Sequence, residues 1–184
     1  MNKISPHAFV SPNVIMGKGN IIEANAIVLD GVILGDNNYI GYGCVIGDLP
    51  EKIGYFEKEK NKGVRIGNNN RFTKLVTVDG GTQIKTEILN DCTFLAAAHV
   101  GHDCVISSNC ILTCGVKLGG GTLVLRYCNF GLNSVTHPRT TVGMGTMLGA
   151  NSFLKGCSRA WTIYAGVPAK EIGENLRGKQ RWLG

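Results

Sequence analysis

The chain carries a repeat of six residues, and this period constrains its fold more than any other feature. In one stretch, apolar residues occupy every sixth position, at Phe94, Val100, Ile106, Leu112 and Leu118. Small or thiol-bearing residues follow four places later, at Ala98, Cys104, Cys110 and Val116. This period fits neither the roughly 3.6-residue turn of an α-helix nor the alternation of a single strand. It predicts that each hexad forms one short strand and one corner, and that three hexads close a triangular coil of a parallel β-helix.

The same period begins near the amino terminus and returns after each interruption, as far as Leu154. Its early apolar positions are Ile4, Val10, Met16, Ile22, Val28, Leu34, Ile40 and Ile46. Only 17% of the residues are charged and 26 are glycine, which fits neither a disordered chain nor a helix bundle. Because one coil cannot bury its own faces, stability must come from contacts between neighbouring coils. We therefore expect an all-β chain with one β-helix domain over residues 1–168.

Two segments depart from the period. Residues 48–63 are highly charged and contain Pro50, which predicts an excursion loop projecting from one corner. The loop is either a solvated insertion or a flap over a neighbouring subunit's site, in which Lys52 and Tyr55 would contact substrate. Residues 169–184 follow a proline and change character, and their pattern predicts a short C-terminal helix that caps the open end of the stack.

Composition limits the partners and the compartment. Five of the seven cysteines fall in the small-residue column of the repeat, which is typical of reduced packing residues in a cytoplasmic protein, with disulfides or a metal site as alternatives. The net charge of +6 suits an anionic ligand such as a phosphorylated cofactor, a nucleotide-sugar or an acidic carrier protein. The basic residues are scattered, so we expect no nucleic-acid partner. We also expect neither a signal peptide nor a membrane span.

The candidate chemistry lies in one repeat, where His99 and His102 stand three residues apart and Asp103 follows the second histidine. Acyl transfer from a thioester needs a base for the acceptor and hydrogen-bond donors for the oxyanion, but no covalent enzyme intermediate. A free histidine titrates near about 6.5 and suits the first task. Glycines 119–121 let backbone amides approach a substrate and suit the second. Because adjacent strand residues point to opposite faces, we expect a backbone carbonyl, and not Asp103, to orient the His102 ring.

Three segments carry a resemblance to a known family: AAAHVGHDCVI at 96–106, the loop position after Gly47, and SVTHPRTTVG at 134–143. The chain resembles the left-handed β-helix acyltransferases of the hexapeptide-repeat class, and residues 40–154 resemble the UDP-N-acetylglucosamine O-acyltransferase of lipid A synthesis. The resemblance implies that His102 is the general base, with Asp103 beside it as a substrate-binding residue. It implies that Gly120 offers its N–H to the acyl carbonyl oxygen, and that His99 and His137 line an acceptor cleft between subunits.

The sequence also departs from this family. Lys52 stands where the family has an acidic residue that holds the sugar. Gly121 replaces a cleft histidine, and Pro138 replaces the glutamine that follows the second cleft histidine. These replacements affect residues that contact the acceptor, so the resemblance specifies the reaction class more closely than the sugar.

The ending IYAGVPAKEI at 163–172 is similar to the coenzyme A-binding end of small sugar and antibiotic acetyltransferases. This similarity makes Lys155, Arg159, Ala165 and Lys170 candidates for contacts with coenzyme A. The resemblances together imply an acyltransferase that moves an acyl group from acyl-CoA or acyl-carrier protein to an amino or hydroxyl group of a nucleotide-linked sugar. The pathway would be cell-envelope glycan or lipid A-type synthesis, with no permanently bound cofactor.

Two other functions stay open. γ-Class carbonic anhydrases share the β-helix and place three histidines at a subunit interface, so His99, His102 and His137 could hold zinc, although the expected pair of ligands five residues apart is missing. A non-catalytic β-helix scaffold or binding module is the second alternative. Flat β-helix faces also predict assembly, and we expect a homotrimer with its sites at the interfaces.

Overall fold

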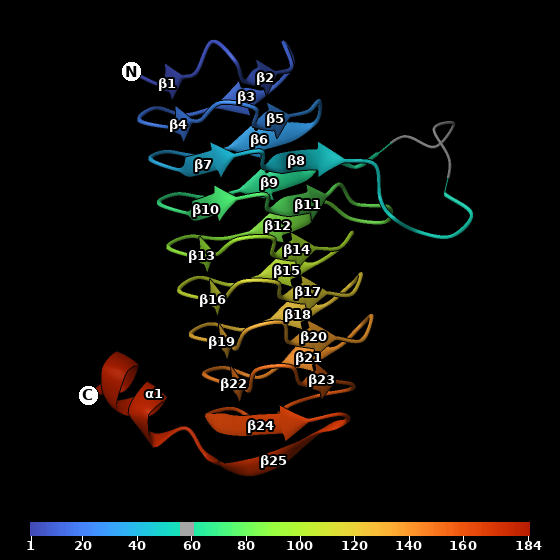
Figure 1. Ribbon diagram of the computed structural model, residues 1–184, viewed down its shortest axis with the longest axis vertical. Coiled ribbons are helices and arrows are strands. Elements are labelled where there is room, and N and C mark those ends of the chain that lie inside the picture. The colour runs from blue at the N-terminus through green and yellow to red at the C-terminus, as the bar shows by residue number, and fades with distance from the viewer. Residues whose placement is uncertain (56–60) are drawn as a thin grey trace.

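The computed structural model describes residues 1–55 and 61–184, and it confirms the predicted parallel β-helix. Three sheets form the faces of a triangular prism, with the N-terminus at one end of the stack and β24 and β25 at the other (Figure 1). Sheet 1 contains β1 (Lys3–Ile4), β4 (Ile21–Ile22), β7 (Tyr39–Tyr42), β10 (Arg71–Lys74), β13 (Thr93–Phe94), β16 (Ile111–Leu112), β19 (Asn129–Phe130), β22 (Met147–Leu148), β24 (Thr162–Gly166) and β25 (Ala169–Glu174).

The other two faces are built in the same way. Sheet 2 contains β2 (Phe9–Val10), β5 (Ile27–Val28), β8 (Val45–Asp48), β11 (Thr77–Asp79), β14 (His99–Val100), β17 (Lys117–Leu118), β20 (Val135–Thr136) and β23 (Phe153–Leu154). Sheet 3 contains β3 (Ile15–Met16), β6 (Val32–Leu34), β9 (Val64–Ile66), β12 (Thr86–Ile88), β15 (Val105–Ile106), β18 (Leu123–Val124) and β21 (Thr141–Val142). The strands pair in parallel with the equivalent strand of the next coil, except β25, which pairs antiparallel with β24.

The six-residue period arises because each two-residue strand turns one side chain outward and the next one inward. The inward residues form columns, as in Phe94, Leu112, Phe130 and Leu148, which are at most 1% exposed and pair in register. The predicted core is therefore confirmed along the middle of the chain. The exception is Ile4, which is 45% exposed because the first coil has a neighbour on one side only.

The corners repeat as regularly as the strands. At many of them one residue adopts a left-handed conformation, which asparagine and glycine tolerate better than other residues. Six asparagines occupy such positions with φ between 54° and 64°: Asn25, Asn37, Asn69, Asn109, Asn133 and Asn151. A second set, Asn20, Asn38 and Asn70, is buried and forms a ladder in which each side chain bonds to the next coil. These positions keep successive corners aligned.

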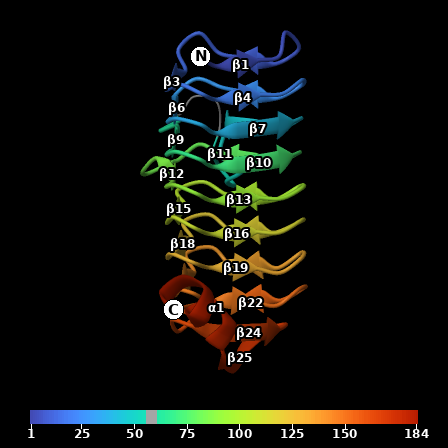
Figure 2. The same ribbon diagram turned by 90° about the vertical axis from the view of Figure 1, so that its left-hand side faces the viewer.

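The prediction for the C-terminal segment was partly wrong. Residues 169–174 form β25, which pairs antiparallel with β24, and only Leu176–Leu183 forms the helix α1. The helix lies beside the last coils and not across the open end (Figure 2). Its Trp182 ring stacks on the Tyr127 ring, with centroids 4.9 Å apart. The strand is favoured because β25 satisfies the edge of β24, which would otherwise be exposed.

The excursion loop leaves the stack between β8 and β9, as predicted, and projects from the corner between sheets 2 and 3 (Figure 1). Lys52 and Tyr55 belong to its described part, whereas residues 56–60 lie outside the described residues. Within the described ranges, no helix has the length and apolar character needed to cross a membrane.

A core substitution tests the inward columns. The Phe72 and Phe94 rings stack in parallel with centroids 4.6 Å apart, and both are fully buried. We expect Phe94→Ala to lower the free energy of unfolding by about 3–5 kcal/mol, because it removes buried area and leaves a cavity. Thr93→Ala, on the outward position of the same strand, should change it by about 0.5 kcal/mol or less. Chemical denaturation of both variants measures the difference, and equal effects would contradict the inward assignment.

Candidate active site

His102 and Asp103 lie in the turn that joins β14 to β15, and their side chains meet. Asp103 has φ of 60°, and the His102 Nδ1 atom lies 2.8 Å from the Asp103 Oδ2 atom. The expectation that a backbone carbonyl orients this ring was therefore wrong. The argument from strand geometry does not apply, because these two residues form a corner and the left-handed residue brings adjacent side chains together.

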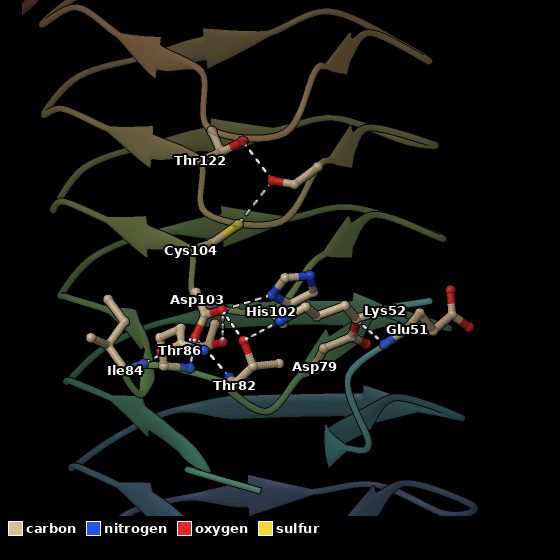
Figure 3. A network of polar contacts seen from close by, with 12 residues as sticks. Glu51, Lys52, Asp79, Thr82, Ile84, Thr86, His102, Asp103, Cys104 and Thr122 are labelled. Atoms are coloured by element: carbon tan, nitrogen blue, oxygen red, sulfur yellow. Dashed lines mark hydrogen bonds and ion pairs between the residues drawn. The ribbon is translucent and has the colours of Figure 1, made fainter. Parts of the chain in front are cut away.

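The Asp103 carboxylate is surrounded by donors from residues 82–84, an irregular segment after β11 (Figure 3). Its Oδ1 atom accepts hydrogen bonds from the backbone amides of Thr82, Gln83 and Ile84 at 2.7, 2.8 and 3.1 Å. Its Oδ2 atom accepts one from the Thr82 hydroxyl at 2.6 Å. Burial by itself would raise the pKa of Asp103, but these bonds and the one from His102 outweigh it and hold the pKa below its usual range.

An ionised Asp103 determines the state of the His102 ring. A carboxylate only accepts hydrogen bonds, so the Nδ1 atom of His102 must carry the proton that Asp103 receives. The Nε2 atom then keeps its lone pair and can act as a base. Asp103 was predicted as a substrate ligand, but its oxygens already receive five donors from the protein. The structure makes it a residue that positions His102.

Gly120 lies directly against this imidazole. A Cβ atom at Gly120 would come within 2.5 Å of the His102 Nε2 atom, so only glycine leaves room for the ring. The neighbouring amides of Gly119 and Gly121 donate to Thr136 O and His102 O. The Gly120 amide has no acceptor among the described residues. A Cβ atom at Gly101 would lie 3.0 Å from this nitrogen, so Gly101 keeps it open to a ligand.

A cluster of buried polar side chains supports the Gly119–Gly121 corner through hydrogen bonds. Thr136, at 1% exposure, bonds the Thr122 hydroxyl at 3.0 Å and the Gly119 amide at 3.2 Å. The Thr122 hydroxyl and the Cys104 thiol both donate to the Gly119 carbonyl. Sequence reasoning did not assign Thr136 a role, although it interrupts an apolar column. A polar residue at an otherwise apolar position was the sequence signal that could have identified this role.

His102 and Gly120 separate two open grooves. The face groove lies on sheet 2, has a volume of about 270 Å³, and is lined by His99, Lys117, Glu51 and Asp79 among others. The corner groove has a volume of about 430 Å³ and is lined by Lys52, Ile84, Gly121 and Arg139 among others. Because both grooves reach the same imidazole, two substrates can approach it from different sides.

His99 points outward from β14 into the face groove. Its Nδ1 atom lies 2.8 Å from the Thr77 hydroxyl, and its Nε2 atom lies 3.9 Å from the Asp79 Oδ2 atom. Burial lowers the pKa of His99. Burial also raises the pKa of Asp79 to about 7. Sequence reasoning missed Thr77, Asp79 and Glu51, because strand pairing and the excursion loop bring them to His99 from other coils.

Of the other residues predicted to contact the substrate, only Lys52 lines a groove beside His102. Lys52 lines the corner groove, with its Nζ atom 3.5 Å from the Thr82 hydroxyl. Tyr55 follows in the loop and its amide bonds the Lys52 carbonyl, but Tyr55 lines neither groove. His137 is exposed and lines neither groove, and its ring packs against Phe153.

The four residues predicted to contact coenzyme A gather near the last coil and line neither groove. Ala165 on β24 pairs with Lys170 on β25, while Lys155 is exposed. The Arg159 guanidinium forms a bidentate ion pair with Glu171, at 3.0 and 3.2 Å. Arg159 therefore already has an anionic partner within the chain.

Neither thiol nor metal chemistry is favoured by the local geometry. All seven cysteines are free, and burial raises the pKa of Cys104, the thiol nearest to the Gly119 corner, to about 12. A neutral buried thiol is a poor nucleophile. In the part of the chain that the structure describes, no group of three or more histidine, cysteine, aspartate or glutamate side chains could hold a metal ion.

Comparisons with known proteins agree with this fold. Residues 13–48 match the family described as bacterial transferase hexapeptide (six repeats). The acyl-[acyl-carrier-protein]–UDP-N-acetylglucosamine O-acyltransferase of Campylobacter concisus is 31% identical over 154 residues, or 82% of this chain. The chain spans 58% of the length of that relative.

Two solved structures extend the likeness to the whole chain. The UDP-N-acetylglucosamine acyltransferase of Campylobacter jejuni superposes with a TM-score of 0.93 at 26% identity, covering 100% of this chain and 73% of that one. The UDP-N-acetylglucosamine acyltransferase of Bacteroides fragilis superposes with a TM-score of 0.90 at 26% identity, covering 98% of this chain and 78% of that one.

The raised pKa of Asp79 leads to a stability prediction. In the unfolded chain this carboxyl titrates near about 4, so between about pH 4 and 7 the folded state binds more protons. The protonated Asp79 therefore stabilises the folded state most below pH 4. This stabilisation is lost as the pH rises toward 7, and the free energy of unfolding falls by at most about 1.4 kcal/mol per pH unit. We expect Asp79→Asn to flatten this dependence in denaturant titrations, while Glu174→Gln, an exposed control on β25, retains it.

Proposed function

We propose that this chain, a left-handed β-helix of hexapeptide repeats, is an acyltransferase that moves an acyl group from a thioester to a nucleotide-linked sugar. The acceptor atom is an amino or hydroxyl group, and the pathway is cell-envelope glycan or lipid A-type synthesis. One observation carries the proposal: Asp103 holds His102 with Nε2 available as a base, directly beside the Gly120 amide, which has no acceptor in the described chain.

The reaction follows from this geometry. His102 Nε2 removes a proton from the acceptor as its oxygen or nitrogen attacks the thioester carbonyl carbon. The carbonyl oxygen becomes an oxyanion and receives the Gly120 N–H, which is already in place and needs no reorganisation. The C–S bond then breaks, and the protonated His102 returns its proton to the departing thiolate. Asp103 stabilises the imidazolium that forms between these two proton transfers.

The similarity to the Campylobacter concisus acyl-[acyl-carrier-protein]–UDP-N-acetylglucosamine O-acyltransferase supports acyl-carrier protein as the carrier of the donated acyl group and UDP-N-acetylglucosamine as the acceptor. Acyl-CoA is the second candidate donor, on the basis of the residues near the last coil. In either case the thioester is a co-substrate, and we propose no permanently bound cofactor. Seven free cysteines and a buried thiol column support a cytoplasmic location.

We also propose that the protein is a homotrimer with the sites between subunits. Both grooves are open on the surface of one subunit, and a second subunit that packs against this surface would cover them. Exposed apolar residues follow the corner between sheets 1 and 2, at Tyr42, Leu75 and Leu132, and are between 52% and 60% exposed. A patch of this kind supports burial against another subunit.

A substitution at His102 tests the catalytic proposal. We expect His102→Ala to lower the kcat/KM of acyl transfer by about 10²–10⁴, because the general base is removed. The assay follows thiol release from acyl-carrier protein or acyl-CoA with UDP-N-acetylglucosamine as the acceptor. His7→Ala, an exposed histidine of the first coil, should keep the wild-type rate. Wild-type turnover by the folded His102→Ala protein would eliminate the base assignment.

The assembly has its own test. Size-exclusion chromatography with light scattering should give a mass three times the chain's 19.7 kDa. Leu132→Glu should shift this mass toward the monomer, because it introduces a charge into the apolar corner patch, while circular dichroism stays unchanged. A wild-type monomer at working concentration would refute the trimer.

A further inference from the structure

Asp79 is a buried carboxyl group on the face groove, and no lysine or arginine among the described residues forms an ion pair with it. Its side chain is only 6% exposed, yet it lines the groove together with His99, His102 and Glu51. It ends β11 at a register shift between Val78 and Asp79, which places its carboxyl group at the corner next to the excursion loop. Figure 3 shows it beside Glu51 and near His102.

The hydrogen bonds of Asp79 leave part of the carboxyl group unsatisfied. The Oδ2 atom accepts the Glu51 amide at 3.2 Å, and the Oδ1 atom has no hydrogen-bond partner among the described residues. His99 lies at 3.9 Å, but burial lowers its pKa, so it is not a cation near neutral pH. The Lys117 ammonium also lines the groove, but it bonds the Ala97 carbonyl and does not pair with Asp79. Burying a carboxylate without a cation is costly, and a ligand could supply the missing charge.

We propose that Asp79 binds the ammonium group of the acceptor, so that the chain acylates an amino-sugar in preference to the corresponding hydroxyl sugar. This inference rests on the proposed function and specifies its acceptor. An ammonium group supplies both a positive charge and several N–H donors to a carboxylate, whereas a hydroxyl supplies one neutral donor. Glu51 adds a second negative charge at the same end of the groove, which favours a cation there and disfavours a phosphate.

The reaction then has two separate proton transfers. The acceptor enters as R–NH₃⁺ and loses one proton to Asp79, which leaves a neutral amine with a nucleophilic lone pair. Its nitrogen forms a bond to the thioester carbon while the C=O π pair moves to the oxygen beside the Gly120 amide. His102 takes the second proton from nitrogen. The C–S bond breaks, the thiolate receives the proton from His102, and the products are an amide, a free thiol and one proton that Asp79 returns to water.

The test compares matched acceptors. UDP-N-acetylglucosamine and analogues in which an amino group replaces one ring hydroxyl in turn are supplied with acyl-carrier protein or acetyl-CoA as donor, and the products are read by mass spectrometry. We expect the wild type to prefer one amino analogue by at least tenfold in kcat/KM. Asp79→Asn, which keeps the shape but removes the charge, should reduce this preference by at least tenfold. Glu174→Gln, at an exposed carboxylate on β25 that lines neither groove around His102, should retain it.

Calorimetric titration separates this inference from the proposed function. Without any donor, the amino analogue should bind Asp79→Asn at least tenfold more weakly than wild type, whereas binding to Glu174→Gln should be unchanged. If the wild type acylates the hydroxyl acceptor as well as the amino analogue, or if Asp79→Asn keeps the wild-type preference, the inference is overturned and the acyltransferase proposal survives. If no acceptor is acylated but amino binding still depends on Asp79, the acyltransferase proposal fails and the amino site stands.

Discussion

In-register stacking of short parallel strands is the constraint on which the rest of this structure depends. A two-residue strand is too short to be stable alone, so each strand persists only because equivalent strands lie above and below it. This requirement forces the inward residue of every hexad to be apolar or small and forces each corner to repeat the one before. The register of Phe94, Leu112 and Phe130 shows the result, with identical positions aligned over successive coils.

Aligned corners also bring chemical groups together from distant parts of the chain. Thr82, Asp103, Gly121 and Arg139 all line one groove, because each belongs to the same edge of the prism in a different coil. The Asp103 carboxylate can therefore accept hydrogen bonds from backbone amides of the preceding coil, while His102 lies against Gly120 of the following coil. The stack itself supplies the preorganisation that the proposed base, His102, and the proposed oxyanion donor, Gly120, need.

Two carboxyl groups near His102 and His99 have opposite electrostatic environments. Asp103 receives five donors, so its pKa is held low and it stays ionised. Asp79 is more deeply buried and accepts one hydrogen bond among the described residues, from the Glu51 amide, and burial raises its pKa to about 7. Such divergent environments commonly distinguish a fixed charge from a group that exchanges protons. Here they separate a residue that orients the base from one that can respond to a ligand.

The sequence by itself determined the β-helix, its inward columns and the excursion loop, and it singled out His102 and Gly120 as candidates, because a six-residue period and a histidine-bearing hexad are local patterns. It misassigned residues 169–174, where the edge of β24 favours a strand over a helix. It also misjudged Asp103, because a left-handed corner residue makes adjacent side chains converge. Only the tertiary structure revealed Asp79, Thr82 and Thr136 as parts of the site. Their roles depend on which coils lie next to one another and on the path of an irregular loop. Neither feature can be inferred from the residues that flank these positions in the sequence.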